Sequence, residues 1–501
     1  MNSKKTALIS VYHKEGIEEF AAALKEMGWE VIASGGTAKH LKGAGVEVTD
    51  ATDIAGVPIL GHRVVTLSRG IHAGLLAERT PEHARELEEN NIPYIDLVCV
   101  DMYPLEEEIK KWMSTPNNPA GAGYTGQARD SVIGMSDIGG PTMLRSGVKG
   151  GRIVICEPED RARVLEWLRA HNNDGNHDDD PFVRELAAKA EAVVARYMFV
   201  SAVYLGEGKF SGTMGTRAAE CLYGENGWQT PAALYSTRIE DPLSLDKFRL
   251  VEGAPLSYNN FGDIDRLLQT LTHIAAGLEV NPVTRDATSA ASNGARIAVA
   301  VKHGNPCGAA FGEDSKKVLE QMIEGDLLAI MGGVVMTNFP IGEAEAETLA
   351  NFGMKEGARR LLDAVAAPSF APEAIELLRR KKDKCRFVAN EALLRVGKSS
   401  LDAAPRFRYV RGGFLQQPNY TFVLNLQSPI IKRHGPRATA ETERDLVFAW
   451  AVGSTSNSNT ITITKEGQLL GDGVGQQDRV GAAKLAIFRA DESASHDAFV
   501  Q

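Results

Sequence analysis

The chain has 501 residues, of which 43% are hydrophobic and 24% are charged, and its formal net charge is −10. A chain of this length is expected to fold as two or three domains, because single hydrophobic cores stop growing beyond about 250–300 residues. These proportions are typical of folded globular proteins and exclude a disordered chain. The negative charge argues against a nucleic-acid-binding protein, which needs a basic face, whereas small anionic ligands remain possible.

The cysteine pattern and the hydropathy of the chain indicate its environment. The five cysteines are widely scattered and form no CxxC pair, so the pattern indicates neither a disulfide framework nor a zinc ribbon. The N-terminus has no long apolar segment, and no later stretch approaches 18 consecutive apolar residues. We therefore expect a cytoplasmic protein without membrane contact.

Strand and helix signals alternate over the first 110 residues. Residues 7–11 form a short apolar run, as in a buried parallel strand. Apolar residues then recur at helical spacing over residues 17–27, and Gly28 is placed to end that helix. Strand signals return at residues 31–33 and 95–100. This alternation predicts a doubly wound α/β domain.

The end of this domain is predicted from a long helix. Residues 113–128 and 171–181 are rich in Pro, Gly, Asn or Asp, and we expect both to be exposed loops. A helical pattern begins near Phe182 and repeats apolar residues up to Tyr197. The domain boundary is therefore expected near residue 200, which divides the chain into domains 1–200 and 201–501.

The second part of the chain is again predicted to be mixed α/β. Apolar residues over 264–274 form one face of a helix, and residues 297–301 form a strand. Alternation at 460–464, followed by Lys465-Glu466-Gly467, predicts a half-buried strand that enters a hairpin. No short repeat is visible, which argues against solenoids and propellers.

Two glycine-rich turns could bind an anion in the first domain. Ser34-Gly35-Gly36-Thr37 lies between a predicted strand and a helix, where backbone amides can converge on a phosphate. A second glycine pair, Gly139-Gly140, follows Asp137. The alternative for each is an ordinary strand–helix turn, and neither turn is specific by itself.

Other polar residues lie near these turns or at strand ends. Lys14, Arg63 and Lys149 are cations that could reach an anion, although most such residues are solvated surface groups. Tyr103 follows a predicted strand, at the edge where parallel sheets place their ligands. A structural tyrosine of the core is the alternative.

Lys302 and His303 directly follow the predicted strand at 297–301 and precede a Gly/Pro turn. A histidine at such a strand end can act as a general base. Pro306-Cys307 is similar to part of a zinc deaminase signature, but Ala310 stands where the second cysteine would be. We therefore expect no metal.

Taken together, these segments resemble the bifunctional AICAR transformylase/IMP cyclohydrolase family over essentially the whole chain. The strings that carry the resemblance occur in the family's order: ALISVYHKEGIEEFAAAL, ASGGTAKHL, RVVTLSRGIHAGLLA, DMYPL, DIGGPTMLR, LYGENGWQ, LSYNN, VKHGNPCGAA, APSFAPEA, VRGGFLQQ, DLVFAWAV and GQLLGDGVGQQDRV. A dozen strings in order make the resemblance specific, although each one is weak alone.

The resemblance implies a fold and a function. Residues 1–200 would be a methylglyoxal-synthase-like doubly wound domain with cyclohydrolase activity. Residues 201–501 would be the transformylase, built from two cytidine-deaminase-like units that lack zinc. The enzyme would formylate aminoimidazole carboxamide ribotide with 10-formyltetrahydrofolate and close the ring to inosine monophosphate. It would be a homodimer, with transformylase sites at the subunit interface.

The resemblance also implies roles for individual residues. Lys302 and His303 match the catalytic pair of the transformylase, and Tyr103, Asp137 and Lys149 match catalytic positions of the cyclohydrolase. Positions that match or neighbour residues binding the substrates are Ser10, Lys14, Ser34, Gly35, Gly36, Thr37, Arg63, Thr66, Asp101, Gly139, Tyr223, Asn459 and Arg479.

Several positions depart from the family's pattern. Its lysine is replaced by Val65, an asparagine by Asp101, an arginine by Leu222, a histidine by Trp228 and an acidic residue by Gly342. The family's KHVKSN is here Ser-Thr-Ser-Asn-Ser-Asn, which ends at Asn459 without the lysines, and the chain ends at Gln501 where the family continues. Charge-assisted hydrogen bonds are worth about 1.5–3 kcal/mol each, so such losses alter binding of a charged nucleotide.

Three interpretations follow. The first is the complete bifunctional enzyme. The second is a divergent relative that acts on an analogue ribotide, which Leu222 and Trp228 favour because they make the pocket less polar. The third is a weakened nucleotide-binding protein, against which the presence of five residues argues: Lys302, His303, Tyr103, Asp137 and Lys149.

Overall fold

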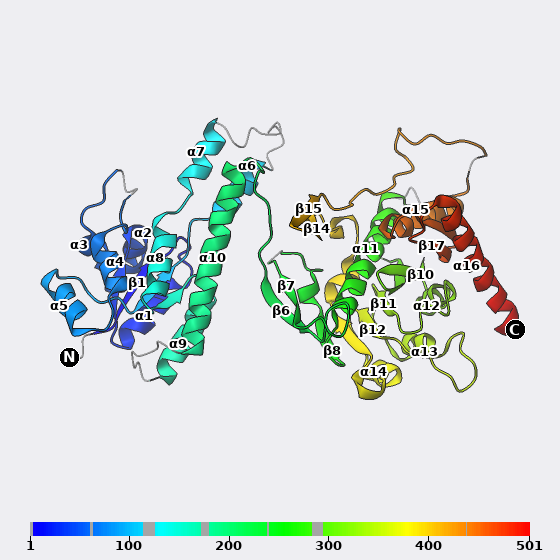
Figure 1. Ribbon diagram of the computed structural model, residues 1–501, viewed down its shortest axis with the longest axis horizontal. Helices are drawn as coiled ribbons and strands as arrows, with labels where there is room; N and C mark the ends of the chain where they lie inside the picture. Colours follow the sequence, from blue (N-terminus) through cyan, green and yellow to red (C-terminus); the bar gives the residue numbers. More distant parts are fainter. Residues whose placement is uncertain are drawn as a thin grey trace. The chain divides into compact units, whose positions relative to one another are not determined.

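The computed structural model describes residues 4–60, 64–113, 126–171, 180–237, 240–282, 294–436 and 438–500. The chain forms two compact units, residues 1–214 and 215–501 (Figure 1). The predicted boundary near residue 200 lies inside helix α10 (Pro181–Leu205). This helix continues because Tyr204, only 4% exposed, still packs against Leu105 and Val132 of the first unit. The predicted loops at 113–128 and 171–181 lie mostly outside the described residues.

The N-terminal unit contains a five-stranded parallel sheet with the order β3-β2-β1-β4-β5. The order reverses between β1 and β4, so the chain leaves the carboxyl ends of these two strands in opposite directions. A crevice for ligands is expected at this point of a doubly wound sheet. The strands are β1 (Thr6–Ser10), β2 (Glu30–Ala33), β3 (Thr49–Asp50), β4 (Leu97–Val100) and β5 (Ile153–Ile155).

Helices cover both faces of this sheet, which confirms the predicted doubly wound domain. Buried residues of α1, α2 and α9 form one core cluster with the sheet, and those of α4 and α8 form another. Helix α10 contributes to both clusters. The other helices of this unit are α1 (Ile17–Glu26), α2 (Gly35–Gly43), α3 (Thr52–Ala55), α4 (Arg69–Leu76), α5 (Pro81–Glu89), α6 (Leu105–Met113), α7 (Gly126–Gly134), α8 (Gly139–Lys149) and α9 (Asp160–Ala170).

Eight strands of the C-terminal unit join in one mixed sheet with the order β16-β17-β10-β9-β11-β12-β13-β8. A division into two cytidine-deaminase-like units stays a prediction. The strands are β8 (Arg249–Glu252), β9 (Arg296–Lys302), β10 (Asn305–Gly312), β11 (Val334–Thr337), β12 (Ala364–Ala367), β13 (Arg386–Ala389), β16 (Ile461–Lys465) and β17 (Gln468–Gly473). Two separate hairpins are β6 (Thr216–Cys221) with β7 (Ala232–Ser236), and β14 (Arg406–Val410) with β15 (Gly413–Gln417).

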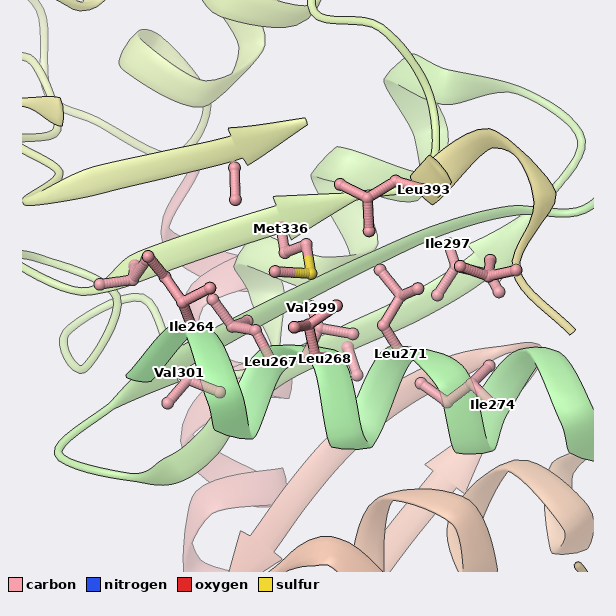
Figure 2. Packing of buried hydrophobic residues seen from close by; sticks show 14 of the residues in the cluster. Ile264, Leu267, Leu268, Leu271, Ile274, Ile297, Val299, Val301, Met336 and Leu393 are labelled. Atoms are coloured by element: carbon pink, nitrogen blue, oxygen red, sulfur yellow. The ribbon is translucent and has the colours of Figure 1, made fainter. Parts of the chain in front are cut away.

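Helix α11 (Tyr258–Val280) packs lengthwise against one face of this sheet. Its Ile264, Leu267, Leu271 and Ile274 point at the strands, as the helical spacing of apolar residues predicted (Figure 2). Helix α15 (Ala440–Thr455) adds Phe448 and Val452 to the same core. The opposite face is covered by α12 (Ser315–Glu324), α13 (Glu343–Asn351) and α14 (Pro372–Leu378), and α16 (Arg479–Val500) packs against β17.

The predicted hairpin near residue 465 is confirmed. Strands β16 and β17 pair antiparallel, with Lys465 opposite Gln468. The two turn residues, Glu466 and Gly467, have φ angles of 52° and 77°. Positive φ at both central positions is the requirement of the type I′ turn that closes two-residue hairpins.

Candidate active sites

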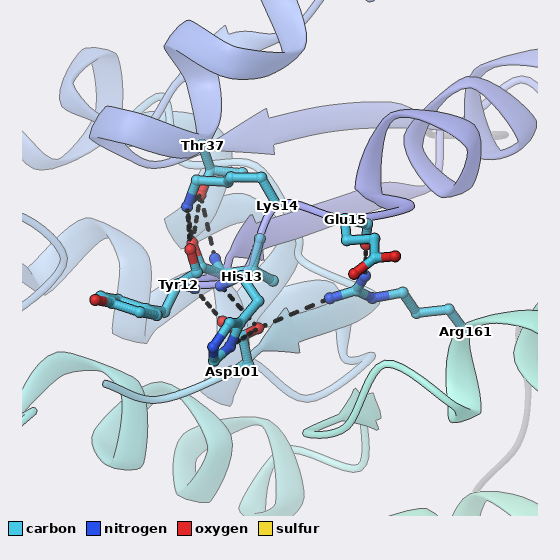
Figure 3. A network of polar contacts seen from close by, with 8 residues as sticks. Tyr12, His13, Lys14, Glu15, Thr37, Asp101 and Arg161 are labelled. Atoms are coloured by element: carbon cyan, nitrogen blue, oxygen red, sulfur yellow. Dashed lines mark hydrogen bonds and ion pairs between the residues drawn. The ribbon is translucent and has the colours of Figure 1, made fainter. Parts of the chain in front are cut away.

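Asp101 connects the loop that follows β4 with the loop that follows β1, at the carboxyl edge of the N-terminal sheet (Figure 3). Its carboxylate follows β4 and accepts hydrogen bonds from the backbone amides of Tyr12 and His13, which follow β1. Arg161 of α9 pairs with the same carboxylate at 3.9 Å and donates to the Glu15 carbonyl at 2.9 Å. Asp101 therefore holds the loop after β1 in place, and its expected contact with the substrate stays a prediction.

The predicted phosphate cradle lies beside this loop. Helix α2 begins at Gly35, so the expected turn is the first turn of the helix. The Ser34 hydroxyl donates to Ser10 Oγ at 2.6 Å instead of capping α2. A Cβ added at Gly35 or Gly36 would meet no described heavy atom within 4 Å, which leaves space at the helix N-terminus.

Lys14 and Thr37 complete the cradle. The Lys14 ammonium donates to the carbonyls of Val11 and Tyr12 and lies 3.3 Å from Thr37 Oγ1. Burial lowers the pKa of Lys14, against the charge of Asp101, which raises it. The Thr37 hydroxyl accepts from the Val11 amide and donates to the Val11 carbonyl, both at 3.1 Å, so it fastens α2 to the end of β1.

Asp137, Gly139 and Thr66 meet at the N-terminus of α8. Asp137 accepts from the Gly140 amide at 2.8 Å. A Cβ at Gly139 would lie 2.6 Å from Thr66 Oγ1, so only glycine lets Thr66 approach this helix end. Burial raises the pKa of Asp137, although the amides of Gly140, Tyr103 and Gly139 lower it.

Tyr103 belongs to the same neighbourhood. Its pKa is raised by burial and by the charge of Asp137, and its ring meets the Tyr12 ring edge-on at 5.6 Å. Tyr197 of α10 accepts from the Asp137 amide at 2.7 Å and donates to the Met135 carbonyl at 2.9 Å. The sequence placed Tyr197 on an apolar helix face, and no motif indicated its polar role.

Lys149 is not brought to this site. It is the last residue of α8, whereas Asp137 and Gly139 lie at the first turn. Eleven helical residues span about 15 Å, and a helix between two parallel strands ends at the opposite edge of the sheet. This corrects the expectation that Lys149 acts beside Asp137. Arg63 lies outside the described residues.

In the C-terminal unit, His303 and Gly304 form the two-residue turn of the β9–β10 hairpin. Lys302 pairs with Asn305 across this turn, and His303 and Gly304 have φ angles of 53° and 73°. A non-glycine residue at positive φ is uncommon and is held there by its surroundings. The Lys302 ammonium donates to the Met331 carbonyl at 2.7 Å.

Two residues of α11 hold the turn. Asp263 Oδ1 accepts from the Gly304 amide at 2.7 Å, and Arg266 Nε donates to the Gly304 carbonyl at 3.0 Å. Burial raises the pKa of Asp263, while the Gly304 amide and the charge of His303 lower it. Neither residue was identified from the sequence, because their role depends on a contact between α11 and the hairpin.

The other predicted residues of this unit are Tyr223, Asn459 and Arg479, which lie on segments next to α11, β16 and α16. Asn457 Nδ2 donates to Asn305 Oδ1 at 2.8 Å, which brings the segment before β16 to the hairpin. Asn459 Nδ2 donates to the Gln476 carbonyl at 3.0 Å, three residues before Arg479, which begins α16. The Tyr223 carbonyl accepts from the Tyr258 amide at 3.2 Å, at the first residue of α11.

Two departures from the family pattern lie beside Tyr223, and a third caps a helix. The side chains of Leu222 and Trp228 are 52% and 82% exposed. Gly342 is the N-cap of α13, and its amide donates to Glu345 Oε2 at 3.1 Å. Gly342, which replaces an acidic residue of the family, therefore lies at the N-terminus of α13.

A cavity of about 750 Å³ adjoins the turn on the α11 side. Arg266, Thr455 and Asn457 line it, as do Arg406 and Arg408 of β14. The predicted residues Lys302 and His303 are not among its lining residues, so this cavity and the turn are neighbouring features rather than one pocket.

Two further observations concern the described residues as a whole. Within the described ranges, no three His, Cys, Asp or Glu side chains group closely enough to hold a metal ion. Among the described helices, none is both long enough and apolar enough to cross a membrane.

Comparisons with known proteins match nearly the whole chain. A family model described as "AICARFT/IMPCHase bienzyme" matches residues 152–489, and one described as "MGS-like domain" matches residues 16–118. The "Bifunctional purine biosynthesis protein PurH" of Anoxybacillus flavithermus is 36% identical over 98% of this chain and 88% of its own length. The protein of the same name from Deinococcus deserti is 33% identical over 98% of this chain and 88% of its own length.

A solved structure is also similar. The chain titled "Crystal structure of ForH" is 34% identical, with 41% of this chain and 100% of that chain covered, at a TM-score of 0.34. The matches to the family model and to the full-length relatives establish the assignment: this chain belongs to the AICARFT/IMPCHase bienzyme family.

Proposed function

We propose that this chain transfers the formyl group of 10-formyltetrahydrofolate to the amine of aminoimidazole carboxamide ribotide and then closes the product to inosine monophosphate. These are the two reactions of its family. The observation that carries the proposal is the His303–Gly304 turn, which presents an imidazole at the tip of a hairpin beside Lys302. Contacts from α11 hold this turn in its left-handed conformation.

In the formyl transfer, His303 is the general base. The substrate amine is a weak nucleophile, because its lone pair is delocalised into the imidazole and the carboxamide. His303 removes its proton while the new carbon–nitrogen bond forms, and Lys302 stabilises the oxyanion that develops on the formyl carbon. Tetrahydrofolate then leaves as the amine. Residues that hold the ribotide are Tyr223, Asn459 and Arg479.

In the ring closure, the carboxamide nitrogen attacks the formyl carbon of the same molecule, and water leaves. Such intramolecular reactions start with an advantage of about 7–11 kcal/mol at best. Asp137 and Tyr103 then transfer protons and stabilise the oxyanion. The carboxyl end of the sheet holds the nucleotide with Ser10, Lys14, Ser34, Gly35, Gly36, Thr37, Arg63, Thr66 and Gly139, whereas Lys149 takes no part.

A second candidate is the same chemistry on an analogue ribotide with a less polar heterocycle. The exposed side chains of Leu222 and Trp228 favour it, because they stand where the family has an arginine and a histidine. Comparing kcat/KM for the ribotide with that for the analogue distinguishes the two. A higher value for the analogue would make it the substrate of this chain.

The assembly and environment are part of the proposal. A homodimer is supported by large apolar side chains that are exposed on the C-terminal unit, among them Tyr409, Leu415, Phe422, Ile430 and Trp450. The molar mass of the protein in solution tests this part of the proposal. A cytoplasmic location is supported by the five widely scattered cysteines, which form no CxxC pair. No metal takes part, so full activity after treatment with a chelator is expected.

The test of the proposal is His303→Ala. We expect the rate of formyl transfer to fall by at least about a hundredfold, in line with general-base contributions, because the proton acceptor is lost. Ring closure of supplied formylated ribotide should be unchanged. His434→Ala, at an exposed position, is the matched control. A His303→Ala variant that keeps most of its transfer rate would remove His303 from this role.

A further inference from the structure

Arg266 is the centre of a set of hydrogen bonds around the His303–Gly304 turn. Its Nε donates to the Gly304 carbonyl at 3.0 Å. One terminal nitrogen donates to the Thr455 carbonyl, and the other donates to Asn457 Oδ1 at 3.4 Å. A planar guanidinium can satisfy these three acceptors together, whereas a lysine ammonium on a flexible chain cannot reproduce the fork.

The bonds continue from Asn457 back to the turn. Asn457 Nδ2 donates to Asn305 Oδ1 at 2.8 Å, and Asn305 Nδ2 donates to the His303 carbonyl at 3.2 Å. This series of hydrogen bonds from Arg266 through Asn457 and Asn305 ends at the His303 carbonyl. Arg266 itself donates directly to the carbonyl of the next residue, Gly304. The Gly304 carbonyl is therefore held by Arg266 of α11, and the His303 carbonyl is held by Asn305, the first residue of β10, which Asn457 holds in turn.

This arrangement bears on the direction of the His303 side chain. The backbone conformation sets where a side chain begins, and His303 has a φ of 53°, which few non-glycine residues adopt. Rotation of either peptide group of the turn would break one of the two carbonyl bonds. The left-handed conformation is thus stabilised by Arg266 from outside the hairpin and by Asn305 from within it.

We propose that Arg266, linked through Asn457, is a positioning residue that fixes the direction in which His303 meets the substrate amine. The inference rests on the proposed function, since it concerns the base of the formyl transfer. The neutral side chain of Asn457 belongs to this device. A cation at position 457 would face the guanidinium and would repel it instead of accepting its hydrogen bond.

The test is a double-mutant cycle on formyl transfer. We expect Arg266→Ala to lower the rate by about 10- to 100-fold, since small misplacements of a reacting group cost factors of this size. In the His303→Ala background, the same change should have less than about a twofold effect, because the group it positions is gone. Asn457→Lys should lower the rate of formyl transfer about as much as Arg266→Ala does. Arg266→Lys should also lower this rate, because an ammonium group cannot replace the guanidinium. Arg408→Ala, an arginine of the neighbouring cavity, is the matched control.

A second measurement does not depend on activity. In protein labelled with ¹³C-histidine, the imidazole resonance that disappears in His303→Ala belongs to His303. It should move in Arg266→Ala and stay in place in Arg408→Ala. Equal rate losses from Arg266→Ala in both backgrounds, or an unmoved His303 resonance, would overturn the proposal. A wild-type chain without formyl transfer would contradict the proposed function, and the resonance would then decide the positioning role.

Discussion

Asp472 of β17 is a buried carboxyl group whose charge state alters stability. The side chain is 2% exposed, and Ser456 Oγ donates to its Oδ2 at 3.4 Å. Burial raises the pKa of Asp472 to about 7, although the charge of Arg489 lowers it. The pKa of Asp472 in the folded protein lies above the unfolded value of about 3.9. The contribution of this carboxyl group to the free energy of unfolding is therefore fully present below about pH 3.9 and is lost as the pH rises through about 7.

Asp472→Asn should therefore stabilise the protein at high pH only. A shift of this size corresponds to up to about 4 kcal/mol once the carboxyl is ionised. We expect the variant to melt several degrees above the wild type at pH 8.5 and at nearly the same temperature at pH 4.5. Equal melting temperatures at both pH values would mean that Asp472 does not titrate in this range.

Gly139 allows Thr66 to approach the N-terminus of α8. A Cβ at this position would lie 2.6 Å from Thr66 Oγ1, a distance that real Cβ contacts do not show. Gly139→Ala should displace Thr66 and lower the rate of ring closure about tenfold or more, while formyl transfer is unchanged. Gly134→Ala is the control, since no described heavy atom lies within 4 Å of its Cβ position. Ring closure at the wild-type rate in Gly139→Ala would show that this approach is unimportant.

Single residues were predictable where a motif fixes them and not where a tertiary contact does. His303 follows a strand and precedes glycine, so its place at a strand end could be read from the chain. Arg266 and Arg161 are ordinary helix residues in the sequence, and only packing brings them to the active-site loops. Lys149 was assigned to the site because its position in the sequence matches a catalytic position of the family. The sequence match does not show that Lys149 and Gly139 lie at opposite ends of α8, about 15 Å apart.

Helix α16 packs so closely on β17 that two glycines are required. A Cβ at Gly473 would collide with the Ala482 carbonyl, and one at Gly471 would collide with the Ala486 carbonyl. Since α16 begins at Arg479, the position of this residue depends on the same contact.

Gly473→Ala should loosen α16 and displace Arg479. We expect a loss of about 1–3 kcal/mol in stability from overpacking, together with weaker ribotide binding. Urea denaturation and calorimetric titration measure the two effects. Gly453→Ala is the control, because its Cβ would meet only the Thr462 side chain, at 3.3 Å. If the affinity of Gly473→Ala for the ribotide is unchanged, α16 does not contribute to ribotide binding.

Elements with strong periodicity were predicted correctly. The apolar spacing of α1 and α11 follows from one face of each helix being buried, whereas β16 forms as a strand whose residues are half-buried or exposed. The expected boundary near residue 200 lies inside α10, because Tyr204 packs seven residues beyond Tyr197, the last apolar residue used for the prediction. The start of α2 was placed too late, since glycines were assigned to a turn although Gly35 and Gly36 begin the helix.

At the scale of the whole molecule, each compact unit carries its own candidate site. The doubly wound unit brings Asp137, Tyr103 and Thr66 to one sheet edge, and the eight-stranded unit presents Lys302 and His303 on a hairpin. Because no residue is shared between the two sites, a change in one should leave the other reaction intact.

The central claim is that one chain performs both reactions at these two sites. The most direct measurement follows ultraviolet absorbance while the purified chain is given the ribotide and 10-formyltetrahydrofolate. We predict that the wild type forms inosine monophosphate, that His303→Ala does so only from supplied formylated ribotide, and that Asp137→Asn accumulates formylated ribotide. A wild-type chain that forms no inosine monophosphate, or variants that lose both steps together, would contradict the account.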